Sequence, residues 1–278
     1  MALPIVQPRR AHATDESISE SHAQNLNVVC WSGGHDSTLM VHYLLHQARA
    51  LEEPFRVVFV DSTITFPETH EYIQEIVKDF GIRKNFVVLK PDLTFYDRLL
   101  RYNFWPSIRA LWCRKLLKLD LLKRYYNGVP GAVTEYVGIS RADSGLRRKM
   151  YRAPEVTRKW GKKTVACRYP LLKWTDQRKA AYFKSERIPR YPIYETMRVS
   201  GCYFCPYYHE KEYRRLRLYH PELFSLLLFC EKITGKRALP DFWLRDVGAS
   251  VSPSLTDFQI QTIGDFAEAL RAHYFKQA

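Results

Sequence analysis

The sequence of 278 residues predicts an α/β fold, a doubly wound parallel sheet with helices on both faces and a smaller C-terminal region that is helical and contains cysteines. Three observations lead to this prediction. Short apolar runs typical of buried strands alternate with segments of helical periodicity. The runs end in glycine or polar residues. Beyond residue 206 only helical periodicity remains.

The first predicted strand, Asn27–Trp31, ends in a glycine turn and is followed by a predicted helix over Thr38–Arg49. Backbone N–H groups and the positive end of a helix meet at such a junction and bind anions, phosphate above all. Two hydroxyls there can donate hydrogen bonds, and the carboxylate of Asp36 is placed to hold Mg²⁺ beside the phosphates. The residues predicted to form this loop are Ser32, Gly33, Gly34, Asp36 and Ser37.

Three more apolar runs predict the other strands, with helices between them. The predicted elements are a strand at Phe55–Thr63, a helix from Thr65 to about Phe80, a strand at Phe86–Leu89, a helix from about Arg114 to Tyr126, and a strand at Val133–Ile139. In a doubly wound sheet ligands bind at the carboxyl ends of the strands. We therefore expect Asp61, Ser62, Gly138 and Arg141 to lie near the glycine turn, and Arg141 to act with Asp36 and Ser37 in catalysis.

Residues 140–163 lack apolar periodicity and are strongly basic. Nine Lys and Arg side chains face two acidic ones, a local excess of +7 that is half of the +14 of the whole chain. We expect a loop, one end of which holds ATP phosphates and the other a second anionic substrate, although a solvated charged surface is the alternative. The predicted nucleic-acid contacts are Arg148, Lys149, Lys162 and Lys163.

The C-terminal third contains a Cys-x-x-Cys pair, Cys202 and Cys205. Before it, Thr175 is a predicted N-cap of a helix that ends before Pro189. After it, helices are predicted near 209–219, 222–235 and 264–275. We expect a flexible arm over residues 1–25, a nucleotide-binding domain over 26–195 and a cysteine-containing helical region over 196–278.

The composition of the chain limits the kinds of partner that it is expected to bind. The net charge of +14 favours a polyanionic partner such as nucleic acid, with a solvated basic surface as the alternative. No apolar run approaches the ~20 residues of a membrane helix, and we expect a cytoplasmic protein without a membrane partner. Six cysteines in such a chain indicate metal binding rather than a disulfide framework.

Taken in order, these motifs resemble the phosphoadenosine-phosphosulfate (PAPS) reductase family of N-type ATP pyrophosphatases, with the adenine-nucleotide α-hydrolase-like fold. The resemblance covers about Asn27 to Pro206. Its motifs are Ser32-Gly-Gly-His-Asp-Ser37, Val60-Asp61-Ser62, Phe66-Pro67-Glu68-Thr69, Trp112-Cys113, Gly138-Ile139-Ser140-Arg141-Ala142-Asp143-Ser144, Pro170-Leu171, Trp174-Thr175, Ile188-Pro189, Pro192-Ile193-Tyr194 and Gly201-Cys202-x-x-Cys205-Pro206.

The chain departs from the family pattern in three places. Reductases of the family carry a catalytic cysteine near the C-terminus, whereas the last cysteine here is Cys230. Trp112 stands where iron–sulfur members have the first cysteine of a pair. Ser140 and Asp143 stand where the family tends to have Arg and Glu. We therefore expect the nucleotide site without the reductive chemistry, as in the ATP pyrophosphatase of DNA phosphorothioation systems.

The resemblance implies ATP and Mg²⁺ as cofactors and assigns Arg147 to the nucleotide. It adds Cys113 to Cys202 and Cys205 as ligands of a [4Fe–4S] cluster, for which spacing alone also allows zinc. Cys230 is a candidate fourth ligand, although its apolar surroundings also suit a core cysteine, and Cys30 and Cys167 are predicted to be structural. A cysteine desulfurase or another sulfur donor is an implied partner, and oligomers are compatible with the sequence.

The predicted function is adenylation of a nucleic acid, the DNA backbone in preference to tRNA, followed by sulfur insertion. Two other enzymes remain open: a phosphoadenylyl- or adenylyl-sulfate reductase and a tRNA thiolation enzyme. A non-catalytic, nucleotide-gated module that binds nucleic acid is the alternative from another class.

Overall fold

The computed structural model describes residues 25–46, 54–197 and 201–248. The predicted N-terminal arm, apart from Asn25, and the predicted helix at 264–275 lie outside these residues. The chain divides into two compact units that alternate along the sequence. The first draws on Met1–Asp61, Pro67–Lys90 and Lys118–Pro192, and the second on Ser62–Phe66, Pro91–Leu117 and Ile193–Ala278.

The first unit is built on a six-stranded sheet with the strand order β3-β2-β1-β4-β6-β5. All neighbours in this sheet are parallel except β5 and β6, which are antiparallel. The order reverses between β1 and β4, as in a doubly wound sheet, and the predicted fold class is confirmed. The strands are β1 Leu26–Trp31, β2 Phe55–Val60, β3 Phe86–Leu89, β4 Val133–Val137, β5 Glu155–Trp160 and β6 Lys163–Arg168.

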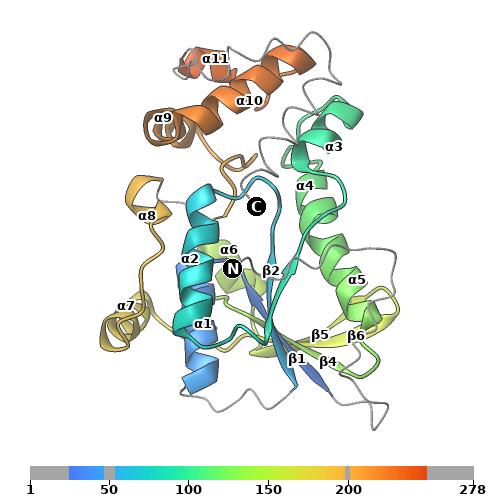
Figure 1. The fold of residues 1–278 in the computed structure, drawn as a ribbon, viewed down its shortest axis with the longest axis vertical. Helices are drawn as coiled ribbons and strands as arrows, with labels where there is room; N and C mark the ends of the chain where they lie inside the picture. The colour runs from blue at the N-terminus through green and yellow to red at the C-terminus, as the bar shows by residue number, and fades with distance from the viewer. Residues whose placement is uncertain (1–24, 47–53, 198–200, 249–278) are drawn as a thin grey trace. The chain divides into compact units, whose positions relative to one another are not determined.

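Helices cover both faces of this sheet (Figure 1). Two crossovers in the same direction place α1 and α2 on one face, and the return to β4 brings α5 to the other. The helices of the unit are α1 His35–His46, α2 Pro67–Asp79, α5 Asp120–Gly128, α6 Gly145–Met150 and α7 Asp176–Ser185. The predicted N-cap at Thr175 is confirmed, because its hydroxyl accepts a hydrogen bond from the Arg178 backbone N–H.

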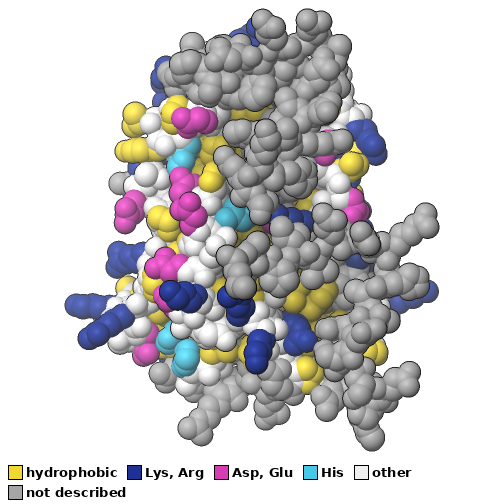
Figure 2. Space-filling view, viewed as in Figure 1, with side chains coloured by type: hydrophobic (Ala, Val, Ile, Leu, Met, Phe, Trp, Pro, Cys, Tyr) yellow, Lys and Arg dark blue, Asp and Glu magenta, His cyan; other side chains and the backbone are white. Residues whose placement is uncertain are grey.

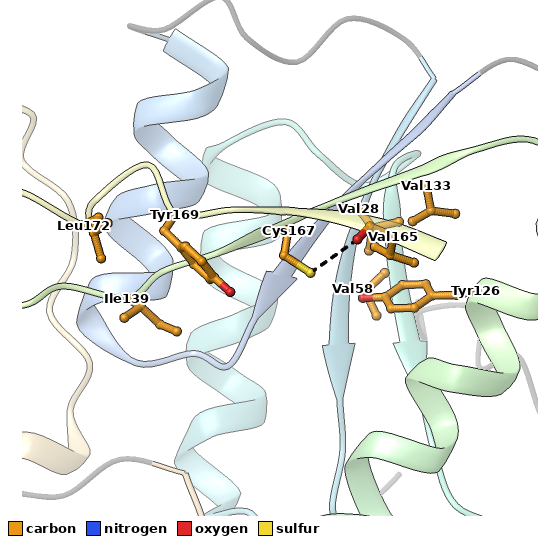
Figure 3. Close-up of a cluster of buried hydrophobic side chains, with 9 residues drawn as sticks. All are labelled: Val28, Val58, Tyr126, Val133, Ile139, Val165, Cys167, Tyr169 and Leu172. Carbon is orange, nitrogen blue, oxygen red and sulfur yellow. Dashed lines mark hydrogen bonds between the residues drawn. The ribbon is translucent and has the colours of Figure 1, made fainter. Parts of the chain in front are cut away.

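The core on the α5 face combines strand valines with Tyr126 of α5, and the two side chains Val28 and Val165 are fully buried (Figure 3). A buried carboxylate lies on the same face. Glu135 accepts hydrogen bonds from the Tyr126 hydroxyl at 2.8 Å and from the thiol of Cys167 at 3.0 Å. Cys30 also reaches this carboxylate, at 3.4 Å. These donors satisfy a charge that burial alone would destabilise, and they give both cysteines the structural role predicted for them.

The prediction of a loop over residues 140–163 is wrong. The segment contains α6, then β5, then a turn at Gly161 with φ of +69° that leads into β6. Strand β5 lies at the sheet edge and exposes most of its side chains, so its basic residues carry no apolar alternation. The predicted single helix over 114–126 is also divided, into α4 (Trp112–Arg114), a π-helical stretch (Lys115–Leu119) and α5.

The second unit is helical around an aromatic core. Its helices are α3 Phe95–Tyr102, α4, α8 Ile193–Thr196, α9 Glu210–Tyr219, α10 Pro221–Thr234 and α11 Leu244–Val247. The Cys202 backbone pairs with that of Thr65 in an isolated antiparallel bridge. Buried Glu231 of α10 accepts hydrogen bonds from the backbone N–H groups of Ala238 and Leu244, which fixes the chain ahead of α11. Among the helices that the structure describes, none has the length and apolar character to span a membrane.

Candidate functional site

The glycine turn after β1 closes tightly against its neighbours. Gly33 has a φ of +78°, and a Cβ there would lie 3.1 Å from a methyl carbon of Thr69. At the end of β4, a Cβ on Gly138 would lie 3.0 Å from the Asp36 carbonyl oxygen and from the Ser37 Cα. The structure thus brings Gly138 against the turn, as the sequence predicts, and both positions need glycine.

The two serines of the turn bond to each other. The Ser37 hydroxyl donates to the Gly34 carbonyl oxygen at 2.9 Å and accepts from the Ser32 backbone N–H at 3.2 Å. The two hydroxyl oxygens lie 3.0 Å apart. These bonds close the turn ahead of α1, so that the helix N-terminus and the glycine backbone define an anion-binding geometry.

Lys179 of α7 joins three carboxylates in this unit, and the sequence prediction did not include it. Its ammonium lies 2.7 Å from Asp143, 2.9 Å from Asp176 and 3.2 Å from Asp36. The Lys179 side chain is only 10% exposed, so its ion pairs with Asp36 and Asp143 are partly shielded from water, whereas Asp176 is 75% exposed. A sequence signal was present, because Lys179 and Phe183 are the two buried positions of α7 and one of them is charged.

Burial and the neighbouring Asp143 carboxylate raise the pKa of Asp36 to about 6, against the effect of Lys179. Burial also acts to raise the pKa of Asp143, but hydrogen bonds with Lys179, Asp36 and the Ser140 backbone, together with the Lys179 charge, outweigh it and the pKa is lowered. For Lys179, burial acts to lower the pKa, and the bonds to Asp143 and Asp176 raise it instead. At neutral pH the group holds one ammonium among three carboxylates. Magnesium bound to phosphates is commonly held in proteins by one or two carboxylates.

His35 stands at the first position of α1, between the glycines and Asp36. Burial lowers the pKa of His35 to about 4, with help from the charges of Arg190 and Lys179. Its ring lies 5.1 Å from that of Phe183 on α7. The imidazole is therefore neutral at pH 7 and adds no charge to the turn.

The predicted arginines are placed differently. Arg147 forms an ion pair with Asp143, which connects it to the Lys179 group. Arg141 follows β4, and its backbone N–H donates to the Leu172 carbonyl oxygen at 3.1 Å. Ser140 donates its backbone N–H to Asp143 at 3.2 Å and so helps to orient that carboxylate.

Asp61 and Ser62 belong to different units. Asp61 is almost fully buried at the end of β2 and lies 3.5 Å from the ammonium of Lys90. The Ser62 hydroxyl lies 3.2 Å from the Cys202 sulfur and 3.3 Å from the Thr65 hydroxyl. The Ser62 hydroxyl thus contacts the cysteine segment within the second unit.

Two tyrosines donate hydrogen bonds to the backbone of the Cys-x-x-Cys segment. The Tyr208 hydroxyl donates to the Cys202 carbonyl oxygen at 2.8 Å, and the Tyr213 hydroxyl donates to that of Cys205 at 3.0 Å. Cys113, Cys202 and Cys205 are partly buried, whereas Cys230 is fully buried in α10, where burial raises the pKa of its thiol well above the usual value. Cys230 therefore has the surroundings of a core residue.

The thiols do not fit a metal cluster in this arrangement. Among residues 25–46, 54–197 and 201–248, no group of three or more His, Cys, Asp or Glu side chains is arranged to hold a metal ion. The iron–sulfur cluster remains a prediction, and zinc gains no support either. An anaerobic visible spectrum and an iron assay of the purified protein test it directly.

The four residues predicted to contact nucleic acid differ in availability. Arg148 and Lys149 are exposed on α6, and Lys162 is exposed at the β5–β6 turn. The Lys163 ammonium donates to the carbonyl oxygens of Val129 and Gly131, so it joins the start of β6 to the loop before β4. On the face shown in Figure 2, Lys and Arg side chains lie among acidic and hydrophobic ones.

A family model described as the phosphoadenosine phosphosulfate reductase domain matches residues 26–266. An uncharacterized protein of Methanocaldococcus jannaschii is 26% identical over 200 residues, which cover 71% of this chain and 40% of that protein. The phosphoadenosine 5'-phosphosulfate reductase of Alteromonas mediterranea is 25% identical over 184 residues, which cover 63% of this chain and 66% of the reductase. The chain thus spans less than half the length of the first relative.

The chain also aligns with a solved structure. The phosphoadenylyl-sulfate reductase from Candida auris, crystallised with phosphate, aligns with 63% of this chain and 80% of its own. The TM-score is 0.48 and the sequence identity is 15%.

Proposed function

We propose that this chain, which belongs to the phosphoadenosine phosphosulfate reductase domain family, uses ATP and Mg²⁺ to adenylate an oxygen atom of a nucleic acid. The observation that carries the proposal is the glycine turn between β1 and α1, with Gly138 packed on it and Asp36 beside it. The turn presents backbone N–H groups to phosphates, and Asp36 supplies a carboxylate at the same place.

In the proposed reaction the substrate oxygen attacks the α-phosphorus of ATP. The bond from the α-phosphorus to the bridging oxygen breaks, and that oxygen leaves on pyrophosphate with the electron pair. The N-terminus of α1 and the glycine backbone stabilise the charge that develops on pyrophosphate. Mg²⁺, when bound, would neutralise phosphate charge, and Asp36 with Asp143 would be its protein ligands.

In the second proposed half-reaction, a sulfur nucleophile attacks the adenylated centre and AMP leaves with the former substrate oxygen. Family membership supports sulfur chemistry of this kind, since relatives such as the Alteromonas enzyme act on sulfate carried by adenosine nucleotides. The net charge of +14 supports a polyanionic substrate rather than a small sulfate ester. Reduction of an adenylyl sulfate is the second candidate, and the 25% identity to that reductase is the observation that favours it.

The products of ATP cleavage test the first half-reaction. The purified chain, incubated with Mg²⁺ and ATP labelled at the α-phosphate, is expected to release pyrophosphate and AMP and to transfer label to DNA or RNA. Asp36→Asn should lower pyrophosphate release about 100-fold, because the loop loses its magnesium-binding charge. Asp176→Asn is the matched control: it also contacts Lys179, but its side chain is 75% exposed and lies outside the loop.

Release of ADP and orthophosphate would contradict the proposal, as would full activity of Asp36→Asn. Labelling of DNA but not RNA, or the reverse, identifies the acceptor. Release of sulfite from phosphoadenylyl sulfate, with a dithiol as the electron donor, would favour the reductase alternative.

A further inference from the structure

The second unit contains a stretch with no acidic residue, from Arg98 to Leu117. It carries five basic side chains, Arg98, Arg101, Arg109, Arg114 and Lys115. This stretch joins α3 to α4 and includes Cys113. A local excess of +5 without any opposing carboxylate favours an anionic partner over a typical protein surface of mixed charge.

Two aromatic rings in this stretch are exposed and stacked on each other. Tyr102 is 37% exposed and Phe104 is 44% exposed. Their centroids lie 5.9 Å apart, and the ring planes differ by 29°. Exposed aromatic faces are unfavourable in water unless a partner covers them, so this pair is a candidate contact surface.

The exposed pair rests on buried rings. The edge of Tyr102 meets Trp112 at 5.7 Å, and Trp112 stacks on Phe95 at 5.2 Å with an interplanar angle of 26°. Between the two exposed rings, Asn103 ends α3 in a left-handed conformation, and its backbone N–H donates to the Leu99 carbonyl oxygen at 2.9 Å. The platform is therefore held in place by the core and by a helix cap.

Three arginines that are near the two rings in the sequence are exposed and can contact a partner. Arg101 directly precedes Tyr102, Arg109 and Arg114 follow, and all three are exposed. Within the described residues none of the three forms an ion pair. A stretch that carries both stacked aromatic faces and unpaired guanidinium groups matches the chemistry of single-stranded nucleic acid, which offers base faces and phosphates together.

We propose that Tyr102 and Phe104 form a stacking platform for unpaired bases of the nucleic-acid substrate, with Arg101 and Arg109 contacting its phosphates. The inference rests on the proposed function for its role, since it specifies that the substrate is bound as a single strand or an unpaired loop. A paired duplex keeps its base faces stacked inside the helix and cannot use such a platform without opening. The platform belongs to the same unit as Cys113, Cys202 and Cys205.

The test compares single-stranded and duplex oligonucleotides, each as DNA and as RNA, labelled with fluorescein and titrated with the full chain. Tyr102→Ala with Phe104→Ala should weaken single-strand binding at least about tenfold, the loss expected for removal of base stacking. Tyr102→Phe keeps an aromatic face and should bind as the parent does. Tyr219→Ala, which removes a tyrosine that is 46% exposed on α9, is the matched control and should change nothing.

Salt separates stacking from charge. Because stacking releases few ions, the double alanine variant should lower affinity at every salt concentration without changing the slope of log K against log salt. Arg101→Gln with Arg109→Gln should reduce that slope on a single strand by about 1.4, which is about 0.7 for each of two phosphate contacts. Unchanged melting temperatures confirm that each variant is folded.

Single-strand binding by the double alanine variant equal to that of the parent would overturn the proposal. An equal loss on single strands and duplexes would overturn it too, as would a change in sedimentation coefficient that shows the rings to be a contact between copies of the chain. Platform binding without any pyrophosphate release would refute the proposed reaction and leave this inference standing.

Discussion

In the first unit, the Lys179 ammonium forms ion pairs with three carboxylates. Its ammonium contacts Asp36, Asp143 and Asp176, and the first two carboxylates are themselves mostly buried. Removing one partner of a shielded ion group leaves uncompensated charge, which costs more than the group contributes as a whole. The lysine thus stabilises the fold and also holds Asp36 beside the glycine turn.

Lys179→Met tests this at the level of stability. The variant keeps the aliphatic length and loses the charge, and its free energy of unfolding should fall by about 3 kcal/mol in urea titrations. Lys184→Met makes the same change on the exposed side of α7 and should have an effect below about 0.5 kcal/mol. Equal stabilities of the two variants would show that the three carboxylates are solvated.

His35 makes stability depend on pH. The unfolded imidazole takes a proton near pH 6.5 and the folded one only near pH 4, so between these values the unfolded state binds more protons. The contribution of His35 to the free energy of unfolding should therefore fall as the pH drops from 6.5 to 4, whereas Asp36, whose pKa is raised to about 6, contributes with the opposite sign. In His35→Gln this contribution is absent, so acidification should destabilise the variant less than the parent in urea titrations at each pH.

His70→Gln controls for the loss of an imidazole at a more exposed position, since its ring is 43% exposed. If the parent and His35→Gln lose the same stability on acidification, the His35 ring is not shielded from water in the folded state.

The residues around Lys179 show what the sequence could predict. Asp36 follows a motif with a local physical reason, a glycine turn between a strand and a helix. Lys179 lies 143 residues away from Asp36, and no local pattern connects the two. Its ion pairs depend on how α7 packs in the first unit, and only the charged residue on the buried side of α7 hinted at them.

Among the elements, α6 is short, basic and entirely without buried residues. A helix without buried side chains gains little stability from tertiary contacts, and the charges of Arg148 and Lys149 face solvent. Arg148 and Lys149 are therefore the predicted nucleic-acid contacts most readily tested, whereas Lys163 has a structural role through Val129 and Gly131.

Arg148→Glu with Lys149→Glu should weaken nucleic-acid binding and reduce the slope of log K against log salt by about two for duplex DNA, since each neutralised phosphate contributes about 0.9. Binding is measured by fluorescence anisotropy over a range of salt. Lys232→Glu with Lys236→Glu makes the same change in net charge in the second unit and is the matched control. Identical slopes for both variants would show that net charge, rather than α6, determines the effect.

The parallel strands β1 to β4 were predictable because each is an apolar run with a polar end, and β3 has the bounds expected for it. Strand β6, which is parallel to β4, was not predicted, because its sequence Lys-Thr-Val-Ala-Cys-Arg is not an apolar run. Strand β5 was not, since an antiparallel edge strand with basic outward side chains has neither an apolar run nor an alternation. The π-helical stretch likewise leaves no local signal, because Leu116, Leu117 and Leu119 suit an α-helix equally well.

At the scale of the whole molecule, the sequence predicted the α/β class and a helical C-terminal region but not the composition of the second unit. Its segments Ser62–Phe66 and Pro91–Leu117 join residues beyond Ile193 through long-range contacts. Phe95 packs on Phe204 at 5.5 Å, and the Tyr96 and Tyr203 hydroxyls lie 2.7 Å apart. Such pairings depend on tertiary structure and are not written in local periodicity.

The alternation of the two units along the chain has a consequence for biosynthesis. A ribosome has synthesised every segment of the first unit once Pro192 has been added to the chain. At that moment Phe95 and Trp105 are already synthesised, but Phe204, the ring on which both pack, is not. The nascent chain therefore contains hydrophobic segments of the incomplete second unit between segments of the first unit, which can already fold. A premature stop codon just after Pro192 would release a polypeptide in this state, with the half-built aromatic core as a target for chaperones and proteases.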